Sequence, residues 1–110
     1  MRILAAFDKC KDSLTAREIC AVAYEVIITH PTSHEIFCIP LTDGGEGFTD
    51  LLTWAKGGSL HSFFAQDSLG EEREAKIGVI QGDQLNLSLR EFTNLPADGN
   101  LAVIEMSTIA

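Results

Sequence analysis

Basic side chains are scarce in this sequence. Lysine and arginine together number 8, against 16 aspartate and glutamate residues, which gives a formal net charge of -8. Such a chain repels the phosphates of nucleic acids and the surface of anionic lipid membranes. We therefore expect neither a nucleic acid nor a membrane as partner. A small anionic ligand remains compatible with this charge, because a local site can override the overall field.

Long apolar runs are also missing. No segment approaches the roughly 20 consecutive apolar residues that a membrane-spanning helix needs. Near the N-terminus, Asp8 interrupts the first apolar stretch too early for the core of a signal peptide. The sequence therefore predicts a cytoplasmic protein.

Cysteine is sparse. The three cysteines, Cys10, Cys20 and Cys38, are odd in number and show no C-x-x-C spacing. This pattern argues against a disulfide framework and a zinc site, and it favours reduced thiols.

What the chain does have is the composition of one small folded domain. Its 110 residues are 45% hydrophobic and 22% charged. These fractions are ordinary for a soluble globular protein and unlike those of a disordered chain.

The first part of the chain alternates strand and helix patterns. Residues 2–7 form a short apolar run typical of a buried strand. Apolar residues then recur at helical spacing over residues 19–27. A capping sequence that begins at Thr15 predicts the start of this helix, and Pro31 predicts its end.

A second strand and helix follow in the same way. Residues 35–40 predict the strand and residues 48–55 the helix, which a pair of glycines ends. The order strand, loop, helix, strand, loop, helix over residues 1–58 predicts an α/β fold with a parallel sheet.

The pattern after residue 58 changes to short strands. Three segments predict the antiparallel strands of a meander: 59–66, 72–80 and 84–90. Residues 101–106 predict a further buried strand, expected to be parallel, with no helix after it to cover the sheet. We therefore expect residues 1–110 to be a piece of a longer protein.

Charged residues fill the loop after the first predicted strand. Asp8, Lys11 and Ser13 lie between this strand and a helix N-terminus, where α/β sheets bind ligands and anions are favoured. Lys11 could hold a phosphate or carboxylate, and Asp8 could bind a hydroxyl or a hydrated Mg²⁺. The alternative is a solvated turn in which Ser13 or Thr15 caps the helix.

Glycines fill the loop after the second predicted strand. This loop reads Asp43, Gly44, Gly45, Glu46, Gly47, so the backbone can approach a ligand closely beside two carboxylates. A carboxylate here could take a proton from a substrate hydroxyl or bind Mg²⁺. The alternative is a tight turn in which the glycines serve only geometry and Glu46 lies favourably on the helix dipole. The loop is neither a P-loop nor a complete G-x-G-x-x-G motif.

The two loops resemble those of the type-1 glycerate kinases of bacteria. That family has a D-S-F-K-G-S-L-S-like stretch, matched here by Asp8–Thr15, and a P-M-A-D-G-G-E-G-T block, matched by Pro40–Phe48. Its D/G-P-L-G turn and V-I-E-M strand resemble Asp67–Gly70 and Val103–Met106. The four motifs follow in the family's order, so the resemblance covers the whole chain.

This resemblance implies ATP-dependent phosphorylation of D-glycerate, usually to 2-phosphoglycerate, with Mg²⁺. It also implies a kinase of two α/β domains with the active site between them. Residues 1–110 would be its N-terminal part, inactive alone: residues 1–58 would begin the sheet domain, and residues 59–110 would be a strand-rich segment returning to a core strand.

Carried over residue by residue, the resemblance gives each loop a role. We assign Asp43 as the base or orienter of the glycerate hydroxyl, Lys11 as a neutraliser of substrate or phosphoryl charge, and Asp8 as a third catalytic candidate. The expected substrate-binding residues are Ser13, Gly44, Gly45, Glu46 and Gly47. No residue is assigned as a metal ligand.

The chain departs from the family at three places. Cys10 replaces an aromatic residue, and Asp12 replaces a glycine, which puts an acid where an anion would sit. The segment 81–100 is longer than the usual hairpin, which suggests an inserted strand or loop.

Two other classes of function remain open on the sequence. One is a stand-alone α/β module that binds small anions at its two helix N-termini without catalysis. The other is a scaffold without a ligand.

Overall fold

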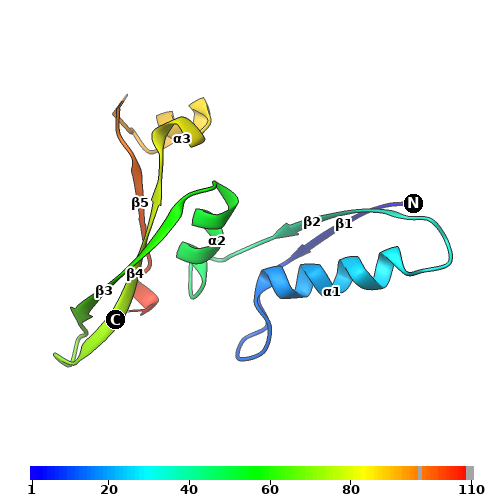
Figure 1. Cartoon of the computed structure of the whole chain (residues 1–110), viewed down its shortest axis with the longest axis horizontal. Helices are drawn as coiled ribbons and strands as arrows, with labels where there is room; N and C mark the ends of the chain where they lie inside the picture. The colour runs from blue at the N-terminus through cyan, green and yellow to red at the C-terminus, as the bar shows by residue number, and fades with distance from the viewer. Residues whose placement is uncertain (97, 109–110) are drawn as a thin grey trace. The chain divides into compact units, whose positions relative to one another are not determined.

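The structure is a computed structural model that describes residues 1–96 and 98–108. The chain forms two units, Met1–Asp43 and Gly44–Ala110, each with its own sheet (Figure 1). Across the described residues, no helix combines the length and apolar character needed to cross a membrane.

The first unit is a strand–helix–strand motif. Strand β1 (Arg2–Phe7) and strand β2 (Glu35–Pro40) pair in parallel, and helix α1 (Ala16–Ile28) runs alongside them (Figure 1). Thr15 caps α1, because its side-chain oxygen accepts a hydrogen bond from the Glu18 backbone N–H at 3.2 Å. These findings confirm the predicted parallel strands and the predicted start of the helix.

Small side chains fill the interface between α1 and the first sheet. Ala5, Ala16 and Cys20 are buried there. The Cys38 thiol of β2 donates a hydrogen bond to the Cys20 carbonyl oxygen at 3.3 Å. Burial, followed by the neighbouring Cys20, raises the pKa of the Cys38 thiol above its ordinary value. All three cysteines are free thiols.

The second unit contains an antiparallel sheet in the order β3-β4-β5. Its helices and strands are α2 (Phe48–Ala55), β3 (Ser59–Gln66), β4 (Glu72–Ile80), α3 (Leu87–Phe92) and β5 (Leu101–Ile104), with 3₁₀ turns η1 (Gly82–Gln84) and η2 (Met106–Thr108). The predicted strands 59–66 and 72–80 and the turn between them are therefore confirmed.

The core of the second unit joins its sheet to α2 and α3. Ile80, Leu85 and Val103 are buried at its centre. Partly buried side chains pack around them: Phe48, Leu52, Leu89, Leu95 and Leu101. Because Phe48 and Leu52 belong to α2, this core fixes the helix that follows the glycine-rich loop.

The strand expected at residues 84–90 is wrong. This part of the chain holds η1 and α3, so the long segment 81–100 contains a short helix rather than an added strand. The Asn86 side chain caps α3 by accepting the Leu89 N–H at 2.8 Å. Leu85 and Leu89, four residues apart, both pack into the core, whereas Leu87 is 72% exposed. Leu85 lies in extended backbone before α3 and Leu89 lies within the helix, so the apparent alternation of leucines spans a turn and a helix start rather than one strand.

The strand expected at residues 101–106 is also partly wrong. Strand β5 ends at Ile104 and pairs antiparallel with β4, not in parallel. Its burial alternates as in a half-exposed strand: Val103 is buried and Ile104 is 53% exposed.

The two units divide after Asp43, so α2 packs within the second unit. This division concerns the present chain. The assignment of residues 1–58 and 59–110 to two parts of a longer kinase stays a prediction.

Candidate functional site

The carboxyl ends of β1 and β2 lie side by side and carry the two candidate loops. Phe7 is paired with Pro40, and the Leu41 N–H donates to the Phe7 carbonyl oxygen at 2.8 Å. Asp8 therefore leaves the sheet next to the segment that leads to Asp43. This edge is where open α/β sheets bind their ligands.

The first loop is closed by its own backbone. The Cys10 N–H donates to the Leu14 carbonyl oxygen at 2.9 Å, and the Leu14 N–H returns a bond to the Cys10 carbonyl at 3.2 Å. Within this turn Asp12 has a φ of 58°, in the left-handed region. Glycine adopts positive φ without strain, so this conformation agrees with the resemblance to a family motif that has glycine at the position of Asp12.

The side chains predicted for this loop are exposed. Asp8, Lys11 and Ser13 all face solvent. Asp8 Oδ1 accepts a hydrogen bond from the Lys9 N–H at 2.6 Å, which orients the carboxylate at the strand end. Of the two caps that the sequence suggested, Ser13 and Thr15, the structure has Thr15 as the N-cap of α1.

Lys9 is a charged residue of the first loop to which the sequence alone gave no role. Its Nζ lies 3.7 Å from Asp43 Oδ1, with 27% of the Lys9 side chain and 66% of the Asp43 side chain exposed. An exposed pair at this distance adds little to stability. Its effect is local, because it puts a positive charge beside the carboxylate that the sequence analysis predicts as base or orienter.

The second loop depends on glycine for its conformation. Gly44 has a φ of 89° and Gly47 a φ of 92°, and a Cβ at either residue would meet no atom within 4 Å. Glycine is therefore required here by backbone geometry. Glu46, between them, is exposed, and the Phe48 N–H donates to the Gly45 carbonyl oxygen at 3.0 Å.

A buried acid far along the chain holds the end of this loop. Glu105 Oε1 accepts the Gly47 N–H at 3.3 Å, and Glu105 Oε2 accepts the Thr49 N–H at 3.2 Å. The N-terminus of α2 thus receives a carboxylate from the chain itself. The sequence contained one signal for Glu105, which is an acid inside the apolar segment 103–106. The sequence alone gave this residue no role beyond its place in the V-I-E-M motif.

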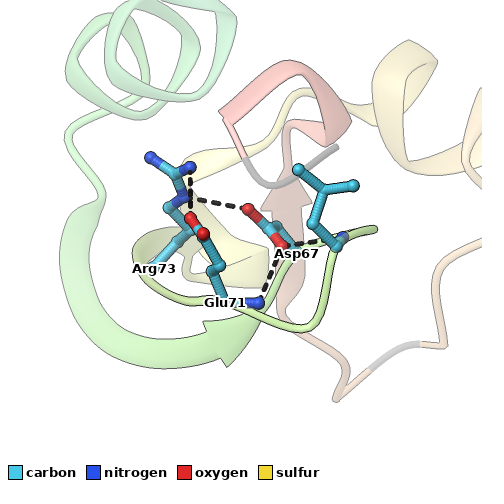
Figure 2. Close-up of polar contacts among 4 residues, drawn as sticks. Asp67, Glu71 and Arg73 are labelled. Carbon is cyan, nitrogen blue, oxygen red and sulfur yellow. Dashed lines mark hydrogen bonds and ion pairs between the residues drawn. The ribbon is translucent and has the colours of Figure 1, made fainter.

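The turn Asp67–Gly70 is a structural feature of the β3–β4 hairpin (Figure 2). Asp67 Oδ1 accepts the N–H groups of Leu69 at 2.8 Å and Glu71 at 2.9 Å, and Arg73 Nε donates to Oδ2 at 2.9 Å. The Glu71 N–H and then the Arg73 side chain hold the pKa of the Asp67 carboxyl below its ordinary value.

The possible metal ligands at the edge of the first sheet are the carboxylates of Asp8 and Asp43. In the described part of the chain, no three His, Cys, Asp or Glu side chains gather into a group that could hold a metal ion. Mg²⁺ keeps most of its waters and commonly takes one or two carboxylates together with substrate phosphates. Asp8 and Asp43 are both exposed, so each carboxylate could contact such a hydrated cation.

Comparison with known proteins gives a consistent result. The chain matches the model of the glycerate kinase family over residues 3–110. It is 34% identical over 79 residues to a glycerate kinase of Bacillus cereus (strain ATCC 10987 / NRS 248), covering 72% of this chain and 21% of that protein. It is also similar to the crystal structure of a protein assigned as glycerate kinase 2 from Salmonella typhimurium LT2. That similarity has a TM-score of 0.62 and 28% identity, and it covers 76% of this chain and 22% of the other.

Proposed function

Because the chain belongs to the glycerate kinase family, we propose that its two strand-end loops serve the ATP-dependent phosphorylation of D-glycerate to 2-phosphoglycerate. The observation that supports this role most directly is the shared edge of β1 and β2, with Lys9 Nζ 3.7 Å from Asp43 Oδ1. The chain spans 21% of its Bacillus cereus relative, so we further propose that it supplies part of the active site and is inactive alone.

Asp43 is the proposed base or orienter for the glycerate hydroxyl. In the proposed step, the hydroxyl proton passes to the Asp43 carboxylate while the hydroxyl oxygen forms a bond to the γ-phosphorus. The bond from that phosphorus to the β-phosphate oxygen breaks, and ADP leaves. Phosphoryl transfer needs little more than positioning and charge stabilisation, which a carboxylate beside a lysine can supply.

The remaining residues of the two loops are proposed to bind and neutralise. Lys11, exposed in the first turn, would offset charge on the substrate or the transferred group, and Ser13 would donate a hydrogen bond. Asp8 would hold a hydrated Mg²⁺ or a hydroxyl. Residues 44–47 would line the substrate-binding site, since a Cβ at Gly44 or Gly47 would meet no atom within 4 Å.

The alternative, a stand-alone anion-binding module, relied on two free helix N-termini. In the structure the Glu18 N–H near the start of α1 is bonded to Thr15, and the Gly47 and Thr49 N–H groups at the start of α2 are bonded to Glu105. Because these N–H groups already have internal partners, they weigh against the anion-binding module.

A coupled assay of ADP release tests the proposal. We expect Mg²⁺-dependent turnover of D-glycerate with ATP by a kinase of full family length that carries residues 1–110, and none by the 110-residue chain alone. Phosphorus NMR of the product distinguishes 2-phosphoglycerate from 3-phosphoglycerate. A full-length kinase that is folded and inactive on glycerate would contradict the proposal.

The same assay tests the role of Asp43. Asp43→Asn removes the proton acceptor, so we expect kcat to fall about 10²- to 10⁴-fold, the usual contribution of a general base. Asp83→Asn is the matched control, because Asp83 is an exposed aspartate in η1, outside both loops. Unchanged turnover in Asp43→Asn would remove Asp43 from the mechanism.

A further inference from the structure

Glu105 is a buried acid to which the proposed reaction gives no role. It directly follows β5 and is 4% exposed. A buried carboxylate is costly unless hydrogen-bond donors or opposite charge compensate for its lost hydration. Its partners therefore indicate why an acid stands at this position.

Three donors surround the Glu105 carboxylate, and two of them belong to the start of α2. Gly47 N–H and Ser107 Oγ donate to Oε1 at 3.3 and 2.5 Å, and Thr49 N–H donates to Oε2 at 3.2 Å. The positive end of the α2 dipole also favours a carboxylate here. The negative charge of Glu105 is thus stabilised mainly by the backbone that ends the glycine-rich loop.

The glycine-rich loop has two positions with left-handed backbone and no side chain to pack. Gly44 and Gly47 adopt left-handed φ values, and a side chain at either would find no neighbour within 4 Å. Side-chain packing therefore does not wedge these two residues in place. The bond from Gly47 N–H to Glu105 ties the loop to the sheet 58 residues further along the chain.

We propose that Glu105 is a positioning residue that holds the loop Gly44–Gly47 in the conformation that binds substrate. The proposal rests on the function proposed above for this loop. It carries a second consequence: the Gly47 and Thr49 amides are occupied by Glu105 and do not bind the carboxylate or phosphate of the substrate.

The tether is tested first without reference to activity, by amide hydrogen exchange in the 110-residue chain. In Glu105→Gln the charge is lost, and the new amide group can offer only one acceptor. We expect the Gly47 and Thr49 amides to lose protection about tenfold relative to wild type, as for a lost hydrogen bond to a charged group. Glu74→Gln, at an exposed glutamate of β4, is the matched control and should leave both amides unchanged. Unchanged protection of both amides in Glu105→Gln would overturn the tether.

The effect on substrate binding is tested in a kinase of full family length that carries this segment. We expect Glu105→Gln to raise KM for D-glycerate about tenfold with little change in KM for ATP, and Glu105→Asp to restore part of the loss. Lower stability alone would reduce the active fraction and leave both KM values unchanged, an outcome that would overturn the positioning role. If Glu105→Gln does not fold, Ser107→Ala replaces it in the exchange and the KM measurements. This variant removes only the hydroxyl that donates to Glu105 Oε1. A parent kinase without glycerate activity would refute the proposed function, and the exchange measurement would still decide the tether.

Discussion

Thr53 of α2 lies directly against Gly78 of β4. Thr53 is 1% exposed, and a Cβ placed on Gly78 would overlap the Thr53 hydroxyl and Cβ. Glycine at position 78 thus lets the helix approach the sheet more closely than any other residue would. This contact helps fix α2, the helix whose first turn ends the glycine-rich loop.

Gly78→Ala should therefore destabilise the second unit. The added methyl group forces α2 away from β4, and overpacking of this kind costs about 1–3 kcal/mol. Chemical denaturation of the wild type and the variant measures the difference. Ser62→Ala, at an exposed position of β3, is the control and should change the free energy of unfolding by no more than about 0.5 kcal/mol. Equal stability of Gly78→Ala and the control would show that α2 does not rest on Gly78.

Asp12 offers a test of backbone strain in the first loop. Its φ of 58° suits glycine best, is tolerated by aspartate, and is poor for a β-branched residue. We expect Asp12→Gly to match or slightly exceed the wild type in stability, and Asp12→Val to lose about 1–2 kcal/mol. Lys11→Val is the control at the neighbouring exposed position. If Asp12→Gly and Asp12→Val unfold at the same midpoint, this turn does not impose the left-handed conformation.

Asp67 should make the stability of the β3–β4 hairpin depend on pH. The Glu71 N–H and Arg73 lower the pKa of its carboxyl in the folded state below the ordinary value of 3.8. The unfolded chain then binds more protons in acid, so the contribution of Asp67 is complete above pH 3.8 and is lost as pH falls through the lowered pKa.

Asp67→Asn tests this dependence. The variant should be less stable than the wild type near neutral pH, with the two thermal midpoints converging as the solution is acidified. Asp83→Asn, at an exposed aspartate outside the hairpin, should track the wild type throughout. A difference for Asp67→Asn that persists unchanged through the acid range would contradict the role of the Asp67 charge.

The three thiols should react with alkylating reagents in a fixed order. Cys10 is exposed, Cys20 is buried, and burial raises the pKa of the Cys38 thiol, which reduces its thiolate fraction at neutral pH. Mass spectrometry after brief iodoacetamide treatment should find Cys10 modified first. Cys10→Ser removes this fast site and should leave a slowly reacting chain. Rapid modification of Cys38 in Cys10→Ser would show that the first unit opens readily.

Local signals in the sequence determined much of this fold. The apolar run of β1, the cap at Thr15 and the turn at Asp67–Gly70 each depend on residues within a few positions of one another. Such signals act through short-range hydrogen bonds and side-chain periodicity, which a single sequence contains in full. The shared edge of the two candidate loops followed from the same information, because parallel strands place their carboxyl ends together.

The tertiary structure decided what local signals left open. Leucines at residues 85, 87 and 89 alternate as in a strand, but the chain turns at Leu85 and Asn86 and enters helix α3, in which Leu89 packs against the core. Lys11 was the lysine of the first loop predicted to neutralise charge, whereas the geometry brings Lys9 beside Asp43.

The sequence alone did not predict which residue contacts the glycine-rich loop. Glu105 meets Gly47 across 58 positions of the chain, and nothing in either local segment specifies the other. The pairing exists because β5 returns to the sheet and the core places its end beside the start of α2. A buried charge must find donors, and only the folded backbone determines which donors lie within its reach.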